Sequence, residues 1–181
     1  AGAVAAGASA SGSTGSDTGT PGLLFFHGTA RDEKLWPESH WIELAKRAGE
    51  AGFEVQLPWG NEPERERASR IAAAAACAGV LPRLSLGQLA VRLLTVRAAV
   101  AVDTGLGHLA AALDVPTVSL YGPTRVELIG AYGANQVHLR SPLEPGRGAS
   151  PNAMMAAIEP AAVWQSLQGL PWSGTREEPA R

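Results

Sequence analysis

The stretch from Ala98 to Thr124, AAVAVDTGLGHLAAALDVPTVSLYGPT, decides the fold of this chain. An apolar run over residues 98–102 ends at Asp103, a segment with apolar residues at helical spacing follows, and a second apolar run covers residues 117–121. The pattern predicts a strand, a helix and a second strand, with one stripe of the helix packed on a sheet.

The first of these strands is followed by Asp103, Thr104 and Gly105, which we place at the N-terminus of the helix. Free backbone N–H groups and the positive end of the helix dipole point out of such a turn, and both suit a phosphate. Gly105 and Gly107 would let this ligand approach the backbone. The turn therefore predicts an anion site.

The rest of the chain repeats the alternation of strands and helices. Strands are predicted at 23–26, 53–57, 80–81, 98–102, 117–121 and 137–139, and helices at 38–51, 62–78, 85–97 and 106–113, with one or two more over 153–167. Without a hairpin signal, this order favours an α/β fold, a Rossmann-like parallel sheet with helices on both faces. Ligands bind such sheets beyond the carboxyl ends of the strands, where the loops 27–34, 59–64 and 103–108 would converge.

The chain has 181 residues, enough for one domain of this kind. Residues 1–22 consist almost wholly of Ala, Gly, Ser and Thr, and we predict a flexible linker there. Residues 23–168 form the predicted Rossmann-like domain, which the resemblance described below implies to bind a nucleotide sugar, and residues 169–181 form a C-terminal tail. The first residue is Ala rather than Met, which suggests a part of a longer chain.

The composition argues against several functions. A net charge of −2 offers no general attraction for nucleic acid or an anionic membrane. Cys77 is the single cysteine, so a disulfide framework and a cysteine metal site are excluded and a reducing cytosol is the simplest compartment. The sequence contains neither a membrane-spanning apolar stretch nor a signal peptide. It also lacks an Asp-x-Asp pair and metal-ligand spacing among its four histidines, so we expect a metal-independent site.

Several polar residues of the three loops have both a functional and a structural interpretation. Lys34 and Thr29 could bind a diphosphate or belong to a solvated turn. Glu64 could accept hydrogen bonds from ribose hydroxyls, but it lies in a run of charges. Asp103 could cap its helix or contact a ligand with equal plausibility. His108 could donate to an anion, although a satisfied histidine is the commoner case.

Three separated blocks carry a family resemblance in order and spacing: HGTARDEKLWPESHW, LPWGNEPERERASRI and VDTGLGHLAAALDVPTVSLYGPT. Over residues 23–167 the chain resembles lipopolysaccharide heptosyltransferases of glycosyltransferase family nine, most closely those of the heptosyltransferase I type. Such enzymes have two Rossmann-like lobes, the GT-B arrangement, and this chain looks like the C-terminal lobe, which binds ADP-heptose.

The resemblance implies a set of donor contacts, without any metal or cofactor. The residues matching the family's contacts to diphosphate and heptose are Thr29, Lys34, Asp103, Thr104, Gly105 and His108, with Glu64 near the ribose and Leu84 beside the adenine. One position departs from the pattern. A second hydroxyl residue often follows the one matching Thr29, and here it is Ala30, so one phosphate or sugar contact would be missing.

The resemblance also implies the reaction of the complete enzyme. It would transfer L-glycero-D-manno-heptose with inversion from ADP-heptose to a Kdo sugar of the lipid A-Kdo acceptor, working as a peripheral protein at the cytoplasmic face of the inner membrane. The acceptor and the catalytic aspartate would belong to the N-terminal lobe, so we expect no catalytic base here. The alternatives are a non-catalytic nucleotide-binding module and an interaction domain without a ligand.

Overall fold

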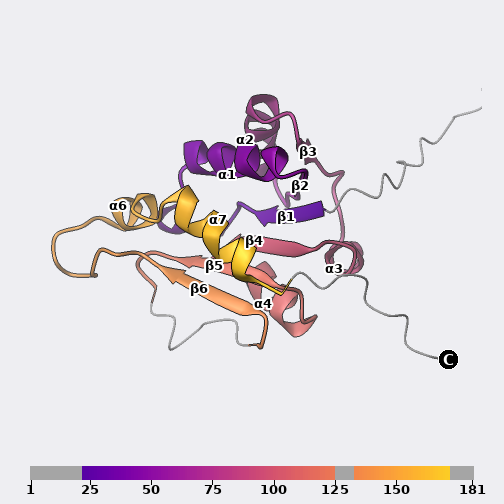
Figure 1. Ribbon diagram of the computed structural model, residues 1–181. Coiled ribbons are helices and arrows are strands. Elements are labelled where there is room, and N and C mark those ends of the chain that lie inside the picture. The colour runs from indigo at the N-terminus through magenta and orange to yellow at the C-terminus, as the bar shows by residue number, and fades with distance from the viewer. Residues whose placement is uncertain (1–21, 125–132, 172–181) are drawn as a thin grey trace, which may run out of the picture.

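The computed structural model describes residues 22–124 and 133–171 (Figure 1). In these ranges strands alternate with helices along the chain. The strands are β1 (Gly22–Phe26), β2 (Glu54–Leu57), β3 (Ala78–Val80), β4 (Ala98–Val102), β5 (Thr117–Tyr121) and β6 (Gln136–Arg140). The helices are the short 3-10 helix η1 (Asp32–Lys34), α1 (Glu38–Glu50), α2 (Glu62–Ala74), α3 (Leu86–Leu93), α4 (Gly105–Ala112), α6 (Pro151–Ala156) and α7 (Pro160–Gly169).

The strands form one parallel sheet in the order β3-β2-β1-β4-β5-β6. Strand β1 lies in the middle, where Leu23 pairs with Val55 of β2 on one side and with Ala98 of β4 on the other. The chain builds outward from β1 to β3 and then crosses to β4. The gap between the carboxyl ends of β1 and β4 is therefore the switch point at which doubly wound sheets bind ligands.

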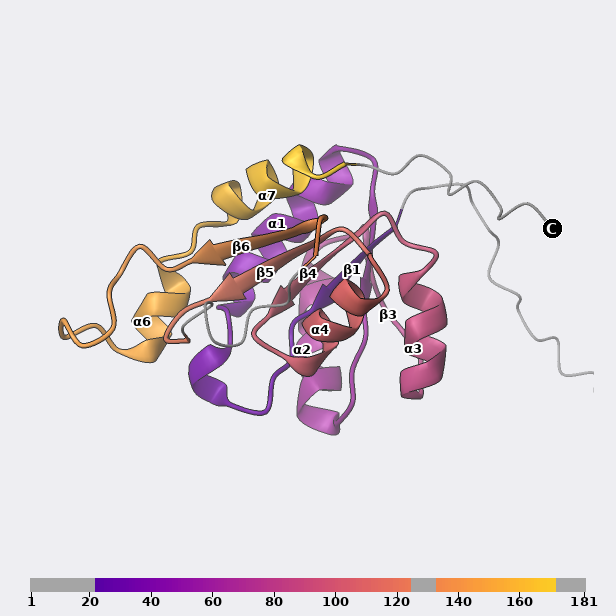
Figure 2. The ribbon, with the colours of Figure 1, turned by 90° about the horizontal axis from the view of Figure 1, so that it is seen from below.

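The central strands are apolar throughout because both faces of the sheet are covered. Leu23 and Phe25 of β1 pack with α1, α2 and α7 on one face. Leu24 and Phe26 alternate with them and pack with α3 and α4 on the other face. Figure 2 shows α3 and α4 together on the near side of the sheet. These layers confirm the predicted fold class, a Rossmann-like parallel sheet with helices on both faces.

Local signals explain where several helices begin and end. Helix α3 starts with a capping box, in which Ser85 and Gln88 exchange side-chain and backbone hydrogen bonds. Helix α7 starts at Pro160. Proline has no backbone N–H, and the first turn of a helix does not use this group in an intrahelical hydrogen bond. Helix α1 is followed by Gly52, whose φ of 83° is the left-handed conformation common after helices.

Two predicted helices end earlier than the sequence suggested. The helix predicted at 62–78 stops at Ala74, and Ala78–Val80 instead forms the edge strand β3 beside β2. The alanine run favours a helix locally, but pairing with β2 overrides this preference. The helix predicted at 85–97 ends at Leu93, and the backbone N–H of Arg97 donates to the Gly22 carbonyl.

The predicted segment boundaries shift slightly at both ends of the domain. Of the linker predicted at 1–22, only Gly22 lies within the described residues, and it is the first residue of β1. Of the tail predicted at 169–181, Gly169 ends α7 and Leu170 is buried in the core. Residues 1–21 and 172–181 lie outside the described residues. In the described part of the chain, no helix combines the length and apolar character needed to cross a membrane.

Candidate functional site

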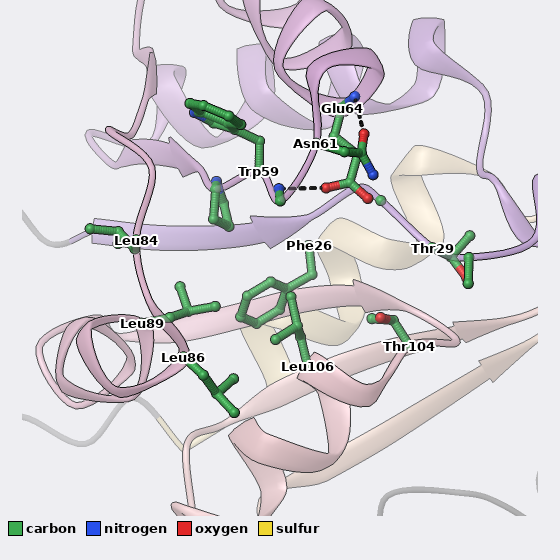
Figure 3. Close-up of a pocket in the computed structure, with 14 residues that line it drawn as sticks. Phe26, Thr29, Trp59, Asn61, Glu64, Leu84, Leu86, Leu89, Thr104 and Leu106 are labelled. Carbon is green, nitrogen blue, oxygen red and sulfur yellow. Dashed lines mark hydrogen bonds between the residues drawn. The ribbon is translucent and has the colours of Figure 1, made fainter.

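A pocket of about 380 Å³ opens at the switch point between β1 and β4 (Figure 3). Its volume is in the range of small-molecule sites. The loops after β1 and β2, the start of α3 and the start of α4 together form its walls. The residues that line it are Phe26, Gly28, Thr29, Ala30, Pro58, Trp59, Gly60, Asn61, Glu64, Leu84, Leu86, Leu89, Thr104 and Leu106.

One end of the pocket is apolar. Leu84, Leu86 and Leu89 reach it from α3 and the loop before it, and Trp59 reaches it from the loop after β2. The indole Nε1–H of Trp59 donates to the Leu81 carbonyl at 2.7 Å, which fixes the ring against this wall. A flat apolar group such as a nucleobase fits this end by its chemistry.

The opposite end of the pocket carries hydroxyl groups. Thr29 follows β1 and Thr104 is the N-cap residue of α4, and Figure 3 shows both on the side away from Leu84. Leu106, in the first turn of α4, also lines the pocket, so the positive end of the helix dipole faces it. Hydroxyl donors beside a helix N-terminus suit a phosphate group.

Glu64 is positioned by the capping of α2. The Asn61 side chain accepts a hydrogen bond from the Glu64 backbone N–H at 2.9 Å and thereby caps the helix. The Glu64 carboxylate turns back and accepts from the Gly60 backbone N–H at 2.7 Å (Figure 3). One carboxylate is therefore held at the pocket wall, with its remaining acceptor capacity available to a ligand.

Lys34 and Asp103 form an ion pair beside the pocket, with 2.5 Å between the lysine Nζ and the Asp103 Oδ2. The hydroxyl of Thr124 donates to the same oxygen at 2.7 Å, and the hydroxyl of Thr29 donates to the Asp103 carbonyl at 3.2 Å. The side chains of Lys34 and Asp103 are only 16% and 8% exposed. This network ties together the segments that follow β1, β4 and β5.

The network corrects two expectations. The N-cap of α4 is Thr104, and Asp103 binds Lys34 and Thr124 instead of capping the helix. The structural interpretation of Asp103 as a cap is therefore wrong. Lys34 is also no isolated cation in a solvated turn, because its charge has a nearly buried partner.

The eight predicted contact residues divide into three groups. Those that line the pocket are Thr29, Glu64, Leu84 and Thr104. Lys34 and Asp103 stand beside it and are joined to it through Thr29. Gly105 and His108 are exposed at the start of α4 and are not part of the pocket wall.

Gly107 does not provide the predicted approach to the backbone. It is buried, and a Cβ there would lie 3.5 Å from Ala101 of the sheet. This is an ordinary van der Waals distance, so Gly107 lies against the sheet, where a ligand does not reach its backbone. Gly105 has open space where a Cβ would stand, so the predicted access remains at this position alone.

Sequence reasoning missed several pocket residues. Trp59 and Asn61 lie in a loop that was predicted to reach the site, but nothing in the pattern gave them a role. Leu86 is 64% exposed. A leucine that remains exposed in the first turn of a helix can indicate a ligand contact, and this was the available signal. Gly28 lines the pocket two residues after the end of β1, and the sequence pattern gave it no role.

A buried histidine, His27, lies at the start of the first loop, on the core side of the pocket. His27 ends the run of buried residues of β1, and its ring packs edge-on to Trp41 with 6.5 Å between the ring centroids. The pKa of His27 is lowered from 6.5 to about 4, mainly by burial and next by the positive charge of Arg67, against smaller opposing effects from the Pro58 carbonyl and Glu38. His27 is therefore neutral at physiological pH and is a packing residue. In the described ranges, His, Cys, Asp and Glu side chains form no group of three able to hold a metal ion.

The sheet order, the switch-point pocket and its polar and apolar ends are those of a doubly wound ligand-binding domain. The sequence model of glycosyltransferase family 9 (heptosyltransferase) matches residues 4–155, which include most of the segment predicted as a linker. The chain belongs to this family.

Relatives and solved structures agree with this assignment. Lipopolysaccharide heptosyltransferase 1 of Pseudomonas aeruginosa is 61% identical over 125 residues, and that of Escherichia coli K12 is 49% identical over 121 residues. These matches cover 69% and 67% of this chain but only 35% and 38% of the relatives. The chain thus spans little more than a third of their length.

The structure of E. coli heptosyltransferase WaaC with ADP superposes with a TM-score of 0.75 at 41% identity, covering 83% of this chain and 44% of that one. The WaaC structure with ADP-2-deoxy-2-fluoro heptose gives a TM-score of 0.72 at 38% identity, covering 84% and 44%. The described fold therefore corresponds to somewhat less than half of a heptosyltransferase chain.

Proposed function

We propose that this chain is the C-terminal, ADP-heptose-binding lobe of an inverting lipopolysaccharide heptosyltransferase. The observation that carries the proposal is the switch-point pocket, which has an apolar end, a fixed carboxylate and a hydroxyl-bearing end at a helix N-terminus. A nucleotide sugar presents the matching groups in the same order: a base, a ribose and a diphosphate. The relatives' names and the bound ADP and fluoro-heptose analogue of WaaC support this choice of ligand.

Each part of the donor has a partner in this proposal. The adenine lies between Trp59 and Leu84, and the ribose hydroxyls donate to Glu64. The diphosphate lies against Thr29, Thr104 and the exposed Gly105, with the ammonium group of Lys34 nearby. The heptose extends toward Asp103 and His108.

The leaving diphosphate gains negative charge as its bond to the anomeric carbon breaks. The helix N-terminus, Thr104 and Lys34 are placed to stabilise this charge, which makes them transition-state contacts of the lobe. The reaction also needs a base for the acceptor hydroxyl. We assign this base, together with the lipid A-Kdo acceptor and peripheral attachment at the cytoplasmic face of the inner membrane, to the N-terminal lobe of the complete enzyme.

Titration of the 181-residue chain with ADP in a calorimeter, in the presence of a chelator, tests the proposal. Binding of ADP and of ADP-heptose without sugar transfer is expected. Glu64→Gln should weaken ADP binding by roughly tenfold to a hundredfold, because hydrogen bonds to a charged group contribute about 1.5 to 3 kcal/mol. Glu66→Gln, an exposed change two residues along the same helix, is the matched control and should bind as wild type.

Three results would count against the proposal. Absence of ADP binding at millimolar concentration would contradict the assignment of this chain as the donor-binding lobe. Equal weakening in the Glu64 and Glu66 variants would show that only the general charge of α2 matters. If ADP-heptose bound no better than ADP, and no contact to the sugar were detectable, the alternative of a non-catalytic nucleotide-binding module would be favoured.

A further inference from the structure

Gly28 is the residue whose missing side chain leaves room for the Glu64 carboxylate. A Cβ at Gly28 would lie 2.6 Å from the Glu64 Cδ and Oε1 and 2.9 Å from its Cγ, far closer than such atoms approach in proteins. The backbone conformation gives no other reason for a glycine, because the described glycines with positive φ are Gly52, Gly146 and Gly148. The need for a glycine at this position therefore comes from the neighbouring carboxylate.

The carboxylate is held from its other side as well. The Gly60 backbone N–H donates to the Glu64 Oε2 at 2.7 Å, while a Cβ at Gly60 would meet this oxygen at an ordinary 3.4 Å. Gly28 follows β1 and Gly60 follows β2, so the carboxylate lies between the loops of two neighbouring strands, bonded to one and given space by the other. Its position is set by these backbones rather than by its own flexible side chain.

The Glu64 carboxylate lies on the pocket wall, between the apolar end and the hydroxyl-bearing end. In Figure 3, Leu84 and Leu89 lie on one side of Glu64, and Thr29 lies on the other. A nucleoside diphosphate that places its base at the apolar end and its phosphates at the hydroxyl-bearing end brings its ribose to this carboxylate. A carboxylate has two acceptor oxygens and matches the two adjacent hydroxyls of a ribose.

We propose that Gly28 is the positioning residue for ribose recognition: by admitting the Glu64 carboxylate beside the backbone, it makes the pocket select nucleoside diphosphates with both ribose hydroxyls over their 2′-deoxy analogues. This inference rests on the proposed function, since it deepens the specificity of the same pocket. It assigns the discrimination to the position of the carboxylate and not to its charge alone.

Gly28→Ala displaces only the end of a flexible side chain, so the fold and its melting temperature should be retained. The experiment is calorimetric titration with ADP and with 2′-deoxy-ADP. Wild type should prefer ADP by roughly tenfold or more, the gain expected from a hydrogen bond to a charged group. In Gly28→Ala this ratio should fall close to one through a loss of ADP affinity, while the affinity for 2′-deoxy-ADP stays the same.

Three further variants sharpen the test. Gly79→Ala makes the same change in β3, where a Cβ meets open space, and should keep the wild-type ratio. Glu64→Asp keeps the charge but withdraws the carboxylate by one methylene, and should lose the discrimination as Gly28→Ala does. In a double variant with Glu64→Gln, Gly28→Ala should have no further effect, because the two changes remove the same interaction.

The outcomes separate the inference from the proposed function. If wild type prefers ADP and either Gly28→Ala or Glu64→Asp keeps that preference, the inference is wrong and the donor lobe stands. If Gly28→Ala weakens both nucleotides equally, the new methyl group blocks the pocket and the positioning role is again wrong. If wild type binds no ADP, the proposed function itself fails.

Discussion

Replacement of Lys34 by Ala should destabilise the fold and weaken nucleotide binding together. The ammonium group lies 2.5 Å from the Asp103 carboxylate, and the two side chains are 16% and 8% exposed. Removing the lysine leaves that carboxylate nearly buried, with its charge unpaired although the Thr124 hydroxyl still donates to it. Breaking a buried pair at one partner costs about 3 to 5 kcal/mol, and the slight exposure of this pair places the expectation near the lower value, about 3 kcal/mol.

Thermal melts followed by circular dichroism measure this loss. For a domain of this size, about 3 kcal/mol corresponds to a fall in melting temperature of roughly 6 to 12 °C. Combining Lys34→Met with Asp103→Asn should recover much of it, since neither charge then remains unpaired. ADP affinity should nevertheless stay about tenfold or more below wild type in the double variant, because the cation is still absent.

Arg47→Ala is the matched control. Arg47 pairs with Glu43 at 2.8 Å on the outer side of α1, and their side chains are 39% and 49% exposed. Exposed pairs of this type contribute at most about 1 kcal/mol. A Lys34→Ala variant that melts no lower than Arg47→Ala would refute the structural role derived from burial, and would leave Lys34 as a ligand contact only.

Two further predictions concern the buried His27 and the pocket residue Trp59. The pKa of His27 is lowered from 6.5 to about 4 in the folded chain, so the unfolded chain takes up its proton at higher pH; stability is full above pH 6.5 and falls between about pH 6.5 and pH 4. At about 1.4 kcal/mol per tenfold change in proton affinity, the loss of stability is at most about 3 kcal/mol. The urea midpoint should fall between pH 7.5 and pH 4.5, and it should fall less in His27→Leu than in wild type. Equal falls in the two proteins would contradict the assignment. Trp59→Ala should weaken ADP binding by about 1 to 3 kcal/mol, the range of a base stacked on an aromatic ring, while Trp59→Phe keeps a ring and should lose less. If calorimetry shows Phe and Ala equally weak, the indole hydrogen bond to Leu81, rather than stacking, accounts for the contribution of Trp59.

The sheet was predictable because its information is local. The apolar runs at 98–102 and 117–121 are fully buried strands, and the segment between them is a helix, as the periodicity indicates. Parallel strands then bring the loops after β1, β2 and β4 to one edge whatever their side chains are. The weak point was β3, a short edge strand directly after an alanine run, which was predicted at 80–81 and lies at Ala78–Val80.

The contacts within the site were less predictable, and Asp103 shows why. An aspartate between a strand and a helix has the composition and position of an N-cap, and no pattern along the chain distinguishes that role from a long-range pair. Its partner Lys34 is 69 residues away, and Thr124 is 21 residues away on the other side. The choice depends on the distance between three loop ends, which only the assembled sheet fixes.

The pairing has a functional consequence under the proposed function: an incoming diphosphate meets a lysine already neutralised by Asp103, so donor binding must share or exchange this cation. Asp103→Asn separates the two cases. If the pair holds the lysine back, the variant should bind ADP at least as tightly as wild type despite a lower melting temperature, whereas if Asp103 orients the lysine for the phosphates, ADP affinity should fall along with stability.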